Sequence, residues 1–230
     1  MVNKYVDFVS DEDFLECIKW VCDSYPLNSE IDMEHLQRNT LDPIKQVFDI
    51  SAMKIDSESW VKNELIRQQD KTINNRIGDF HQRLLGKVEG WEDLGTGDST
   101  KVDLRKTDNS IFMELKNKEN TVNADSKDQV RRKLSKILEL HPNAQTYWAY
   151  ILSKKGDSGE CIWKYHDEEN PKIKKIWGKN VYQLVTGKDN ALEQVWNAIP
   201  LAVADVMSNN FFLSVSEKEK LKAFFVEAFQ

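Results

Sequence analysis

Two short runs of alternating apolar and polar residues, separated by a tight turn, constrain the fold of this chain more than any other feature. The runs KVDLRK (101–106) and SIFMELK (110–116) flank Thr107, Asp108 and Asn109, which are of types common in turns. Alternation at a period of two is typical of β-strands. The pattern therefore predicts a β-hairpin over 101–116.

Three charged residues are expected to converge on one face of this hairpin. Side chains alternate along a strand, so Glu114 and Lys116 point away from the apolar face of the second strand. In the first strand, Val102 and Leu104 are expected to point one way and Asp103 the other. Pairing the two apolar faces then brings Asp103 beside Glu114 and Lys116.

Two carboxylates and an ammonium in one place suit phosphodiester hydrolysis. Hard oxygen ligands hold Mg²⁺, the metal lowers the pKa of bound water and screens developing charge on the phosphate, and an adjacent ammonium assists. We predict Asp103, Glu114 and Lys116 as catalytic residues, with Asp103 and Glu114 as ligands of Mg²⁺. The role of Lys116 stays open between orienting or deprotonating water and stabilising the transition state.

An acidic residue two positions before a lysine is a degenerate signal. It occurs at Glu114-Leu-Lys116 and again at Asp125-Ser-Lys127. Only the first lies in an apolar run, where burying a carboxylate is costly without a metal or a partner. The alternative is an exposed sheet edge, on which Glu114 and Lys116 are solvated and Asp103 forms a weak surface pair with Lys116.

Apolar residues at helical spacing recur through much of the remaining sequence. They predict helices over 11–25, 43–49, 57–85, 126–140 and 190–208, the last broken or kinked near Pro200. Asp42 and Ser126 are the expected N-caps of the second and fourth of these helices. A final helix is expected to open with a capping box formed by Ser216 and Glu219.

Strand-like runs rich in β-branched and aromatic residues follow at 145–153, 160–165 and 181–186. Together with the hairpin they predict an α/β fold, a mixed central β-sheet of about five strands flanked by α-helices. No repeat or linker divides the chain, so one domain is expected over 1–230. Its parts are a mainly helical 1–90, the hairpin, helix and sheet of 91–190, and C-terminal helices over 191–230.

Composition excludes several classes of protein. There is no apolar stretch of about 18 residues and no signal-peptide pattern, so a soluble, cytoplasmic protein is expected. Cys17, Cys22 and Cys161 are odd in number and widely spaced, which argues against a disulfide framework and a zinc site. No phosphate-binding loop and no GxSxG motif is present. A formal charge of −6 describes only the average field, so local clusters must decide on nucleic acid binding.

Asp103, ten intervening residues and then Glu114-Leu-Lys116 resemble the PD-(D/E)xK nuclease signature. The wider stretches IGDFHQRLLGKVEGW (77–91), DLRK and MELKNKENTVN (113–123) resemble a family of type II restriction endonucleases that cut GGNCC or GGWCC sites. The resemblance covers roughly 74–135. It implies a restriction-endonuclease-like fold, a homodimer, a short palindromic site in double-stranded DNA, dependence on Mg²⁺, staggered cuts and a cognate DNA methyltransferase acting on the same site.

The resemblance also bears on individual positions. Val102 stands where the idealised motif has proline, so Asp98 remains an alternative metal ligand to Asp103. Relatives in the superfamily often carry a glutamate on a helix before the hairpin, which makes Glu64, and less so Asp79, an accessory candidate. The alternative for both is a solvated helix face.

Polar residues after the hairpin are the candidates for contact with DNA. Lys118, Asn120, Thr121 and Asn123 can bind phosphates or read base edges, and Arg131 and Arg132 belong to a basic helix. The alternatives are an Asn-rich turn and a solvated, charge-balanced helix face. A second basic cluster at 172–179, with Trp177 in it, either touches a DNA backbone or is a solvated loop.

Two other functions remain open at this level. One is a non-catalytic DNA-binding protein that keeps a nuclease fold. The other is a nuclease directed to structured or damaged DNA. Nothing in the residues explains how a central base pair would be treated.

Overall fold

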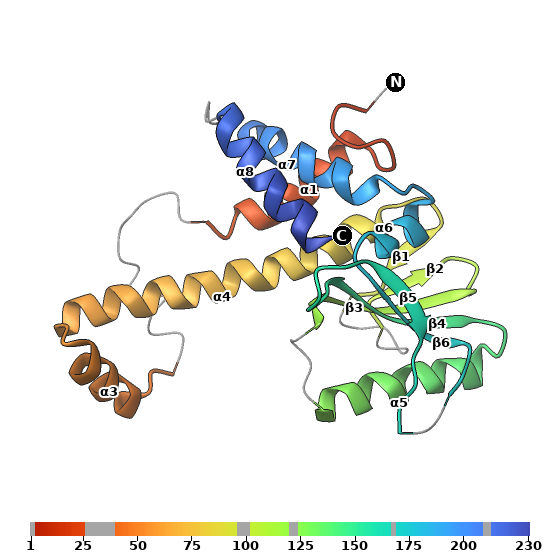
Figure 1. Cartoon of the computed structure of the whole chain (residues 1–230), viewed down its shortest axis with the longest axis horizontal. Helices are drawn as coiled ribbons and strands as arrows, with labels where there is room; N and C mark the ends of the chain where they lie inside the picture. The colour runs from red at the N-terminus through yellow and green to blue at the C-terminus, as the bar shows by residue number, and fades with distance from the viewer. Residues whose placement is uncertain (1–2, 26–39, 96–101, 120–123, 167–168, 209–212) are drawn as a thin grey trace.

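A mixed sheet of six strands, in the order β1-β2-β3-β4-β6-β5, forms the centre of the computed structural model (Figure 1). The model describes residues 3–25, 40–95, 102–119, 124–166, 169–208 and 213–230. The strands are β1 (Trp91–Asp93), β2 (Leu104–Lys106), β3 (Ile111–Lys118), β4 (Gln145–Leu152), β5 (Gly159–Ile162) and β6 (Ile173–Trp177). β3, β4 and β6 run parallel, and the other neighbours are antiparallel. The predicted fold class is confirmed, with one strand more than the five expected.

Helices cover both faces of the sheet (Figure 1). One face is covered by α5 (Ala124–Leu140). The other carries α1 (Asp11–Cys22), the C-terminal part of α4 (Ser57–Gly86), α6 (Lys179–Thr186) and α7 (Ala191–Met207), with α8 (Val215–Ala228) packed on this layer through Phe225. No helix in the described ranges is both long and apolar enough to cross a membrane.

The central strand β3 contributes to a hydrophobic core on each side of the sheet. Phe112 packs in the core beneath α5, whereas Met113 and Leu115 pack in the larger core on the opposite face. Because both faces are covered, the middle of β3 from Phe112 to Leu115 is removed from water. Glu114 is accordingly only 4% exposed. The expectation of a solvated strand edge at Glu114 is thus wrong.

The strand before the turn departs from the predicted alternation. Val102 lies in the core beneath α5 and Leu104 in the opposite core, so the two do not share a face. The chain bends at Asp103, and regular pairing with β3 begins only at Leu104 opposite Met113. Because of this bend, the Val102 side chain lies in the core beneath α5, while Asp103 stays next to β3.

The predicted strand over 181–186 is wrong, because this segment forms the helix α6. Val181, Tyr182 and Val185 are buried together at helical spacing against the sheet, and tertiary packing overrides their β-propensity. The basic cluster at 172–179 instead contains the sixth strand. Ile173 and Ile176 anchor β6 in the two cores, so this segment is not a solvated loop.

Two predicted helix starts are displaced. α5 begins at Ala124, which places Ser126 inside the helix and not at its N-cap. The capping box of α8 is formed by Ser214 and Glu217, two residues earlier than expected. Ser214 accepts a hydrogen bond from the backbone N–H of Glu217 at 3.2 Å, and the Glu217 carboxylate accepts from the Ser214 N–H at 3.0 Å.

α4 is a 30-residue helix whose N-terminal half, together with α3 (Pro43–Met53), projects from the rest of the molecule (Figure 1). Asp42 caps α3 as predicted, accepting from the backbone N–H groups of Ile44 and Lys45 at 2.9 and 3.1 Å. α3 continues to Met53, beyond the expected end at Asp49. At its other end α4 delivers the chain to β1 and the hairpin.

Candidate active site

Asp103 is held in place by the hydrogen bonding of the sheet itself. Its backbone N–H donates to the carbonyl of Met113 at 3.1 Å, and its carboxylate oxygen Oδ2 accepts the backbone N–H of Leu115 at 2.7 Å. The side chain therefore takes the place of a backbone acceptor just where the chain bends. This contact fixes the carboxylate against β3 without help from any other side chain.

Glu114 and Lys116 meet Asp103 on the face of the sheet covered by α5. The Lys116 Nζ lies 2.8 Å from Oε1 of Glu114 and 3.5 Å from Oδ2 of Asp103. The Glu114 side chain is 6% exposed, and those of Asp103 and Lys116 are partly exposed. The structure thus brings together the three residues that strand alternation places on one face.

A second lysine, which the sequence did not single out, completes this cluster. Lys133 on α5 places its Nζ 2.5 Å from Oε2 of Glu114, so each oxygen of that carboxylate has its own ammonium partner. Lys133 belongs to the basic helix for which the sequence left open phosphate binding or a solvated, charge-balanced face. The signal that marks it is its position three residues after Val130 and four before Ile137, both of which face the core.

Burial and neighbouring charges shift the pKa values of Asp103 and Lys116 in this cluster. Burial raises the pKa of the Asp103 carboxyl, and the neighbouring Glu114 raises it further. Burial lowers the pKa of Lys116, but the charges of Asp103 and Glu114 outweigh it and the pKa ends above its ordinary value. Lys116 is therefore a protonated ammonium at neutral pH.

Comparisons with known proteins identify the family. A family model described as Eco47II restriction endonuclease matches residues 6–208. The chain belongs to this family. It is 34% identical to the type II restriction enzyme Sau96I of Staphylococcus aureus over 218 residues, which cover 89% of this chain and 82% of that enzyme. It is 30% identical to the type II restriction enzyme Eco47II of Escherichia coli over 240 residues, which cover 96% and 97%.

Membership of the Eco47II family confirms the class of enzyme expected from the resemblance, a type II restriction endonuclease. The matched range includes the whole sheet and the cluster of Asp103, Glu114 and Lys116.

The donor set of this Eco47II-family chain suits Mg²⁺. Two carboxylate oxygens, from Asp103 and Glu114, approach the single Lys116 ammonium, so the pocket between them already accommodates a cation. In the described residues no group of three or more His, Cys, Asp or Glu side chains gathers. That is enough for Mg²⁺, which is held by one or two carboxylates and takes its other ligands from water and substrate phosphate.

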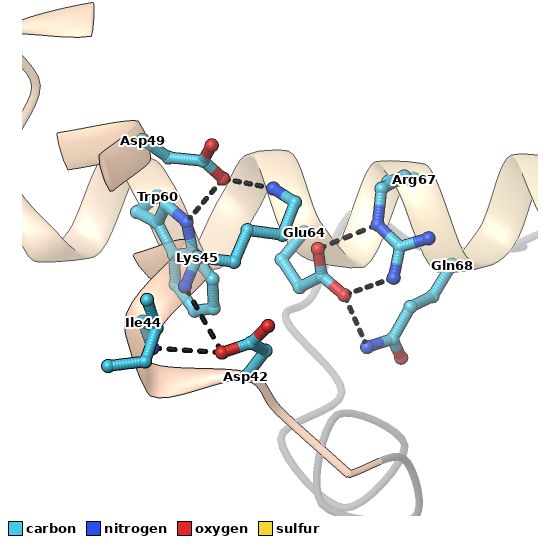
Figure 2. A network of polar contacts seen from close by, with 8 residues as sticks. All are labelled: Asp42, Ile44, Lys45, Asp49, Trp60, Glu64, Arg67 and Gln68. Atoms are coloured by element: carbon cyan, nitrogen blue, oxygen red, sulfur yellow. Dashed lines mark hydrogen bonds and ion pairs between the residues drawn. The ribbon is translucent and has the colours of Figure 1, made fainter. Parts of the chain in front are cut away.

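Glu64, the accessory candidate, lies apart from this cluster and is paired within α4. Arg67 donates to both of its carboxylate oxygens, at 2.7 and 2.5 Å, and Gln68 donates at 2.9 Å (Figure 2). α4 passes β3 near Gly78, where an added Cβ would lie 3.8 Å from Cβ of Asn117. At about 1.5 Å per residue, Glu64 lies about 20 Å along the helix from that point. Asp79, the lesser candidate, is exposed on α4.

The residues expected to contact DNA fall into three groups: some are exposed, one is buried, and the rest lie outside the described residues. Lys118 at the end of β3 and Arg132 on α5 are exposed. Arg131 is only 7% exposed, and its guanidinium donates to the backbone carbonyl of Trp163 at 3.1 Å. Asn120, Thr121, Asn123 and the alternative ligand Asp98 lie outside the described residues.

Proposed function

We propose that this chain is a Mg²⁺-dependent type II restriction endonuclease that hydrolyses phosphodiester bonds in double-stranded DNA with Asp103, Glu114 and Lys116 as its catalytic residues. The supporting observation is the approach of one ammonium to two carboxylates on a buried sheet face. The cluster also fits the PD-(D/E)xK pattern. A buried carboxylate pair of this kind is costly unless it serves a cation.

In this proposal Asp103 and Glu114 hold the metal ion. Mg²⁺, when bound, lowers the pKa of a water molecule and screens charge on the phosphate. Asp103 keeps its orientation through the Leu115 N–H, so the ligand is already positioned before the metal arrives. Such pre-organisation saves the cost of ordering the side chain during the reaction.

Lys116 acts as an electrostatic group and not as the resting base. In the metal-free site its raised pKa keeps it protonated, so there it has no free electron pair with which to accept a proton from water. A protonated ammonium beside the scissile phosphate donates hydrogen bonds to the phosphate oxygens and stabilises their growing charge. Of the roles left open by the sequence, stabilisation of the transition state is the one we propose.

Plasmid cleavage tests this assignment. Purified protein with Mg²⁺ is expected to give discrete bands, and Glu114→Gln and Lys116→Met are each expected to slow cleavage by at least about 100-fold. Glu160→Gln is the matched control, because Glu160 is also paired with a lysine, Lys174, but at the far edge of the sheet. Unchanged cleavage in both site variants would falsify the assignment.

The recognition sequence is proposed from the resemblance and from the two relatives. We propose a short palindrome, GGNCC or GGWCC, and sequencing of the fragment ends tests it. Ends that map to one such site support the proposal. Ends scattered over many sequences favour a nuclease directed to structured or damaged DNA, and metal-independent binding without cutting favours the non-catalytic alternative.

We also propose that the enzyme acts as a homodimer. A palindromic site has two-fold symmetry and is most simply cut by a two-fold protein. α3 offers a surface for such contact, because none of its residues is buried and Ile44, Val47 and Phe48 are each more than 60% exposed. Light scattering is expected to give twice the monomer mass, and Phe48→Glu is expected to lower it toward the monomer.

The proposal extends to the cellular setting. An enzyme that cuts a short site would cut its own host unless that site were modified, so we propose a cognate DNA methyltransferase that acts on the same sequence and a cytoplasmic location. Plasmid methylated at the mapped site is expected to resist cleavage. Cleavage of methylated and unmethylated plasmid at equal rates would contradict this part of the proposal.

A further inference from the structure

A row of side chains on the α5-covered face links the catalytic strand to β6. Glu114 on β3 pairs with Trp148 on β4, and Trp148 pairs with Lys175 on β6. Neighbouring strands lie about 4.8 Å apart, so the backbone of Lys175 is about 10 Å from that of Glu114. Lys175 therefore belongs to the same face of the sheet as the catalytic cluster.

Lys175 shares an indole ring with a second lysine. Its Nζ lies 5.1 Å from the ring centre of Trp148 and 5.7 Å from that of Trp163. The Nζ of Lys127 on α5 lies 5.8 Å from the ring centre of the same Trp148 side chain. Two ammonium groups from different elements thus gather over one aromatic side chain, and both residues are partly exposed.

Neither lysine of this pair has a direct ion-pair partner within the part of the chain that the structure describes, although the charge of Glu119 acts on Lys175. No carboxylate there forms an ion pair with Lys127 or Lys175. The adjacent lysine, Lys174, points to the opposite face and is paired with Glu160 at 2.7 Å. Contact with an indole favours a cation electrostatically but leaves its charge in place.

Partial burial of its ammonium group disfavours the charged form of Lys175. Burial lowers the pKa of its ammonium and the charge of Lys127 lowers it further, and together they outweigh Cys161 and Glu119, which raise it. A bound anion would offset both burial and repulsion. The positions of the two lysines, beside the catalytic row and open to solvent, are those of a site for an anion with several acceptor oxygens.

We propose that Lys127 and Lys175 together bind one phosphate of the DNA backbone, a phosphate other than the one that is cut. This inference rests on the proposed function, which supplies DNA as the ligand. A phosphate has enough oxygens to accept from both ammonium groups, and its contact carries no sequence information. The site therefore holds the duplex in register on the sheet without reading bases.

The salt dependence of DNA binding tests this inference. Binding of a short labelled duplex is measured over a series of salt concentrations with Ca²⁺ in place of Mg²⁺, for wild type, Lys127→Met, Lys175→Met and the double variant. Methionine keeps an apolar stem against the indoles. Loss of one phosphate contact lowers the slope of log K against log salt by about 0.9 and weakens binding on every sequence.

Because the two lysines share one phosphate, each single variant and the double variant are expected to lose the same slope of about 0.9. Lys174→Met, on the same strand and the opposite face, is expected to keep the wild-type slope. Thermal melting establishes that each variant is folded, and Lys175→Gln replaces Lys175→Met if the latter is not.

Two outcomes would overturn the inference. Wild-type slopes in Lys127→Met and Lys175→Met show that no phosphate lies there, and single losses that add in the double variant show two separate contacts. Failure of the proposed function looks different, since wild-type protein would then not cut DNA with Mg²⁺, whatever the slopes of the lysine variants. If the lysine variants keep the wild-type slope of log K against log salt while cleavage depends on Glu114, only the phosphate site is refuted.

Discussion

Lys133 on α5 and Glu114 on β3 form an ion pair in which 2.5 Å separates Nζ from Oε2. With Lys116 on the other oxygen, the Glu114 carboxylate lies between two ammonium groups. A metal ion that binds Glu114 must compete with at least one of them. Lys133 is the one that comes from a different element and does not contact Asp103.

Replacement of Lys133 by methionine is expected to strengthen metal binding in the absence of DNA. The substitution removes a competing cation and leaves the carboxylates more negative, so the dissociation constant for Mg²⁺ or Ca²⁺ is expected to fall about tenfold, equivalent to about 1.4 kcal/mol. Titration calorimetry on DNA-free protein measures it. Lys136→Met, an exposed lysine one turn along α5, is the control, and equal affinities in both variants would refute the idea.

Asp103→Asn is expected to raise the melting temperature of the metal-free protein at pH 7. The pKa of Asp103 is raised in the folded state, so the folded protein binds this proton more tightly than the unfolded chain does. The ionised carboxylate therefore lowers stability at neutral pH, and this loss disappears as pH falls below about 4. Asparagine keeps an oxygen for the Leu115 N–H.

Calorimetry at pH 7 and in acid measures this effect. In a chain of this size, a change of about 1 kcal/mol in the free energy of unfolding shifts the melting temperature by about 2–4 °C. Added Mg²⁺ is expected to raise the melting temperature of the wild type but not of Asp103→Asn. A lower melting temperature for the metal-free variant at pH 7 would show that the carboxylate stabilises the fold, contrary to its raised pKa.

His81 is expected to make the protein sensitive to mild acid. Burial lowers its pKa to about 4, and its Nδ1 lies 2.7 Å from the hydroxyl of Tyr182. The unfolded chain takes up this proton near pH 6.5, so stability is lost as pH falls from there toward 4, by about 2 kcal/mol at pH 5. Urea unfolding at pH 7 and pH 5 is expected to show this loss in the wild type and not in His81→Gln. Parallel losses in the two proteins would contradict it.

The joint between α4 and β1 is expected to tolerate no side chain. A Cβ added at Gly86 would lie 2.5 Å from Cβ and 2.7 Å from the backbone N of Asp93. Gly86→Ala should therefore destabilise the protein by about 1–3 kcal/mol. Gly78→Ala, on the same helix, meets only Asn117 at 3.8 Å and should stabilise by up to about 1 kcal/mol. Equal effects of the two substitutions on urea unfolding would show that the contact at Asp93 relaxes freely.

Local pattern predicted the hairpin, most helices and the central cluster, because these depend on short-range alternation. The position of Asp103 beside Glu114 followed from strand pairing, even though the bend that turns Val102 to the other core did not. Sequence could not place Lys133, since its contact with Glu114 depends on how α5 crosses β3. That crossing is fixed by packing of the whole α5 face.

The errors have a common physical cause. In α6 the β-branched residues at 181 and 185 resemble a strand, yet packing on the sheet makes them a helix face. In β6 the lysines are typical of a solvated loop, yet the strand pairs with β4 on one side and β5 on the other. Lys175 also lies beside the indoles of Trp148 and Trp163. Glu64 was an accessory candidate because it is on the helix before the hairpin, and the length of α4 separates it from the hairpin.

α4 contacts the sheet at its C-terminal end, and its N-terminal end projects from the rest of the molecule (Figure 1). Its 30 residues span about 45 Å, from α3 to the close contact of Gly86 with Asp93. A tilt of about 5° at the C-terminal end moves the far end by about 4 Å over that length. By this geometry alone, a small rotation of α4 beside β1 would displace α3 by a larger distance.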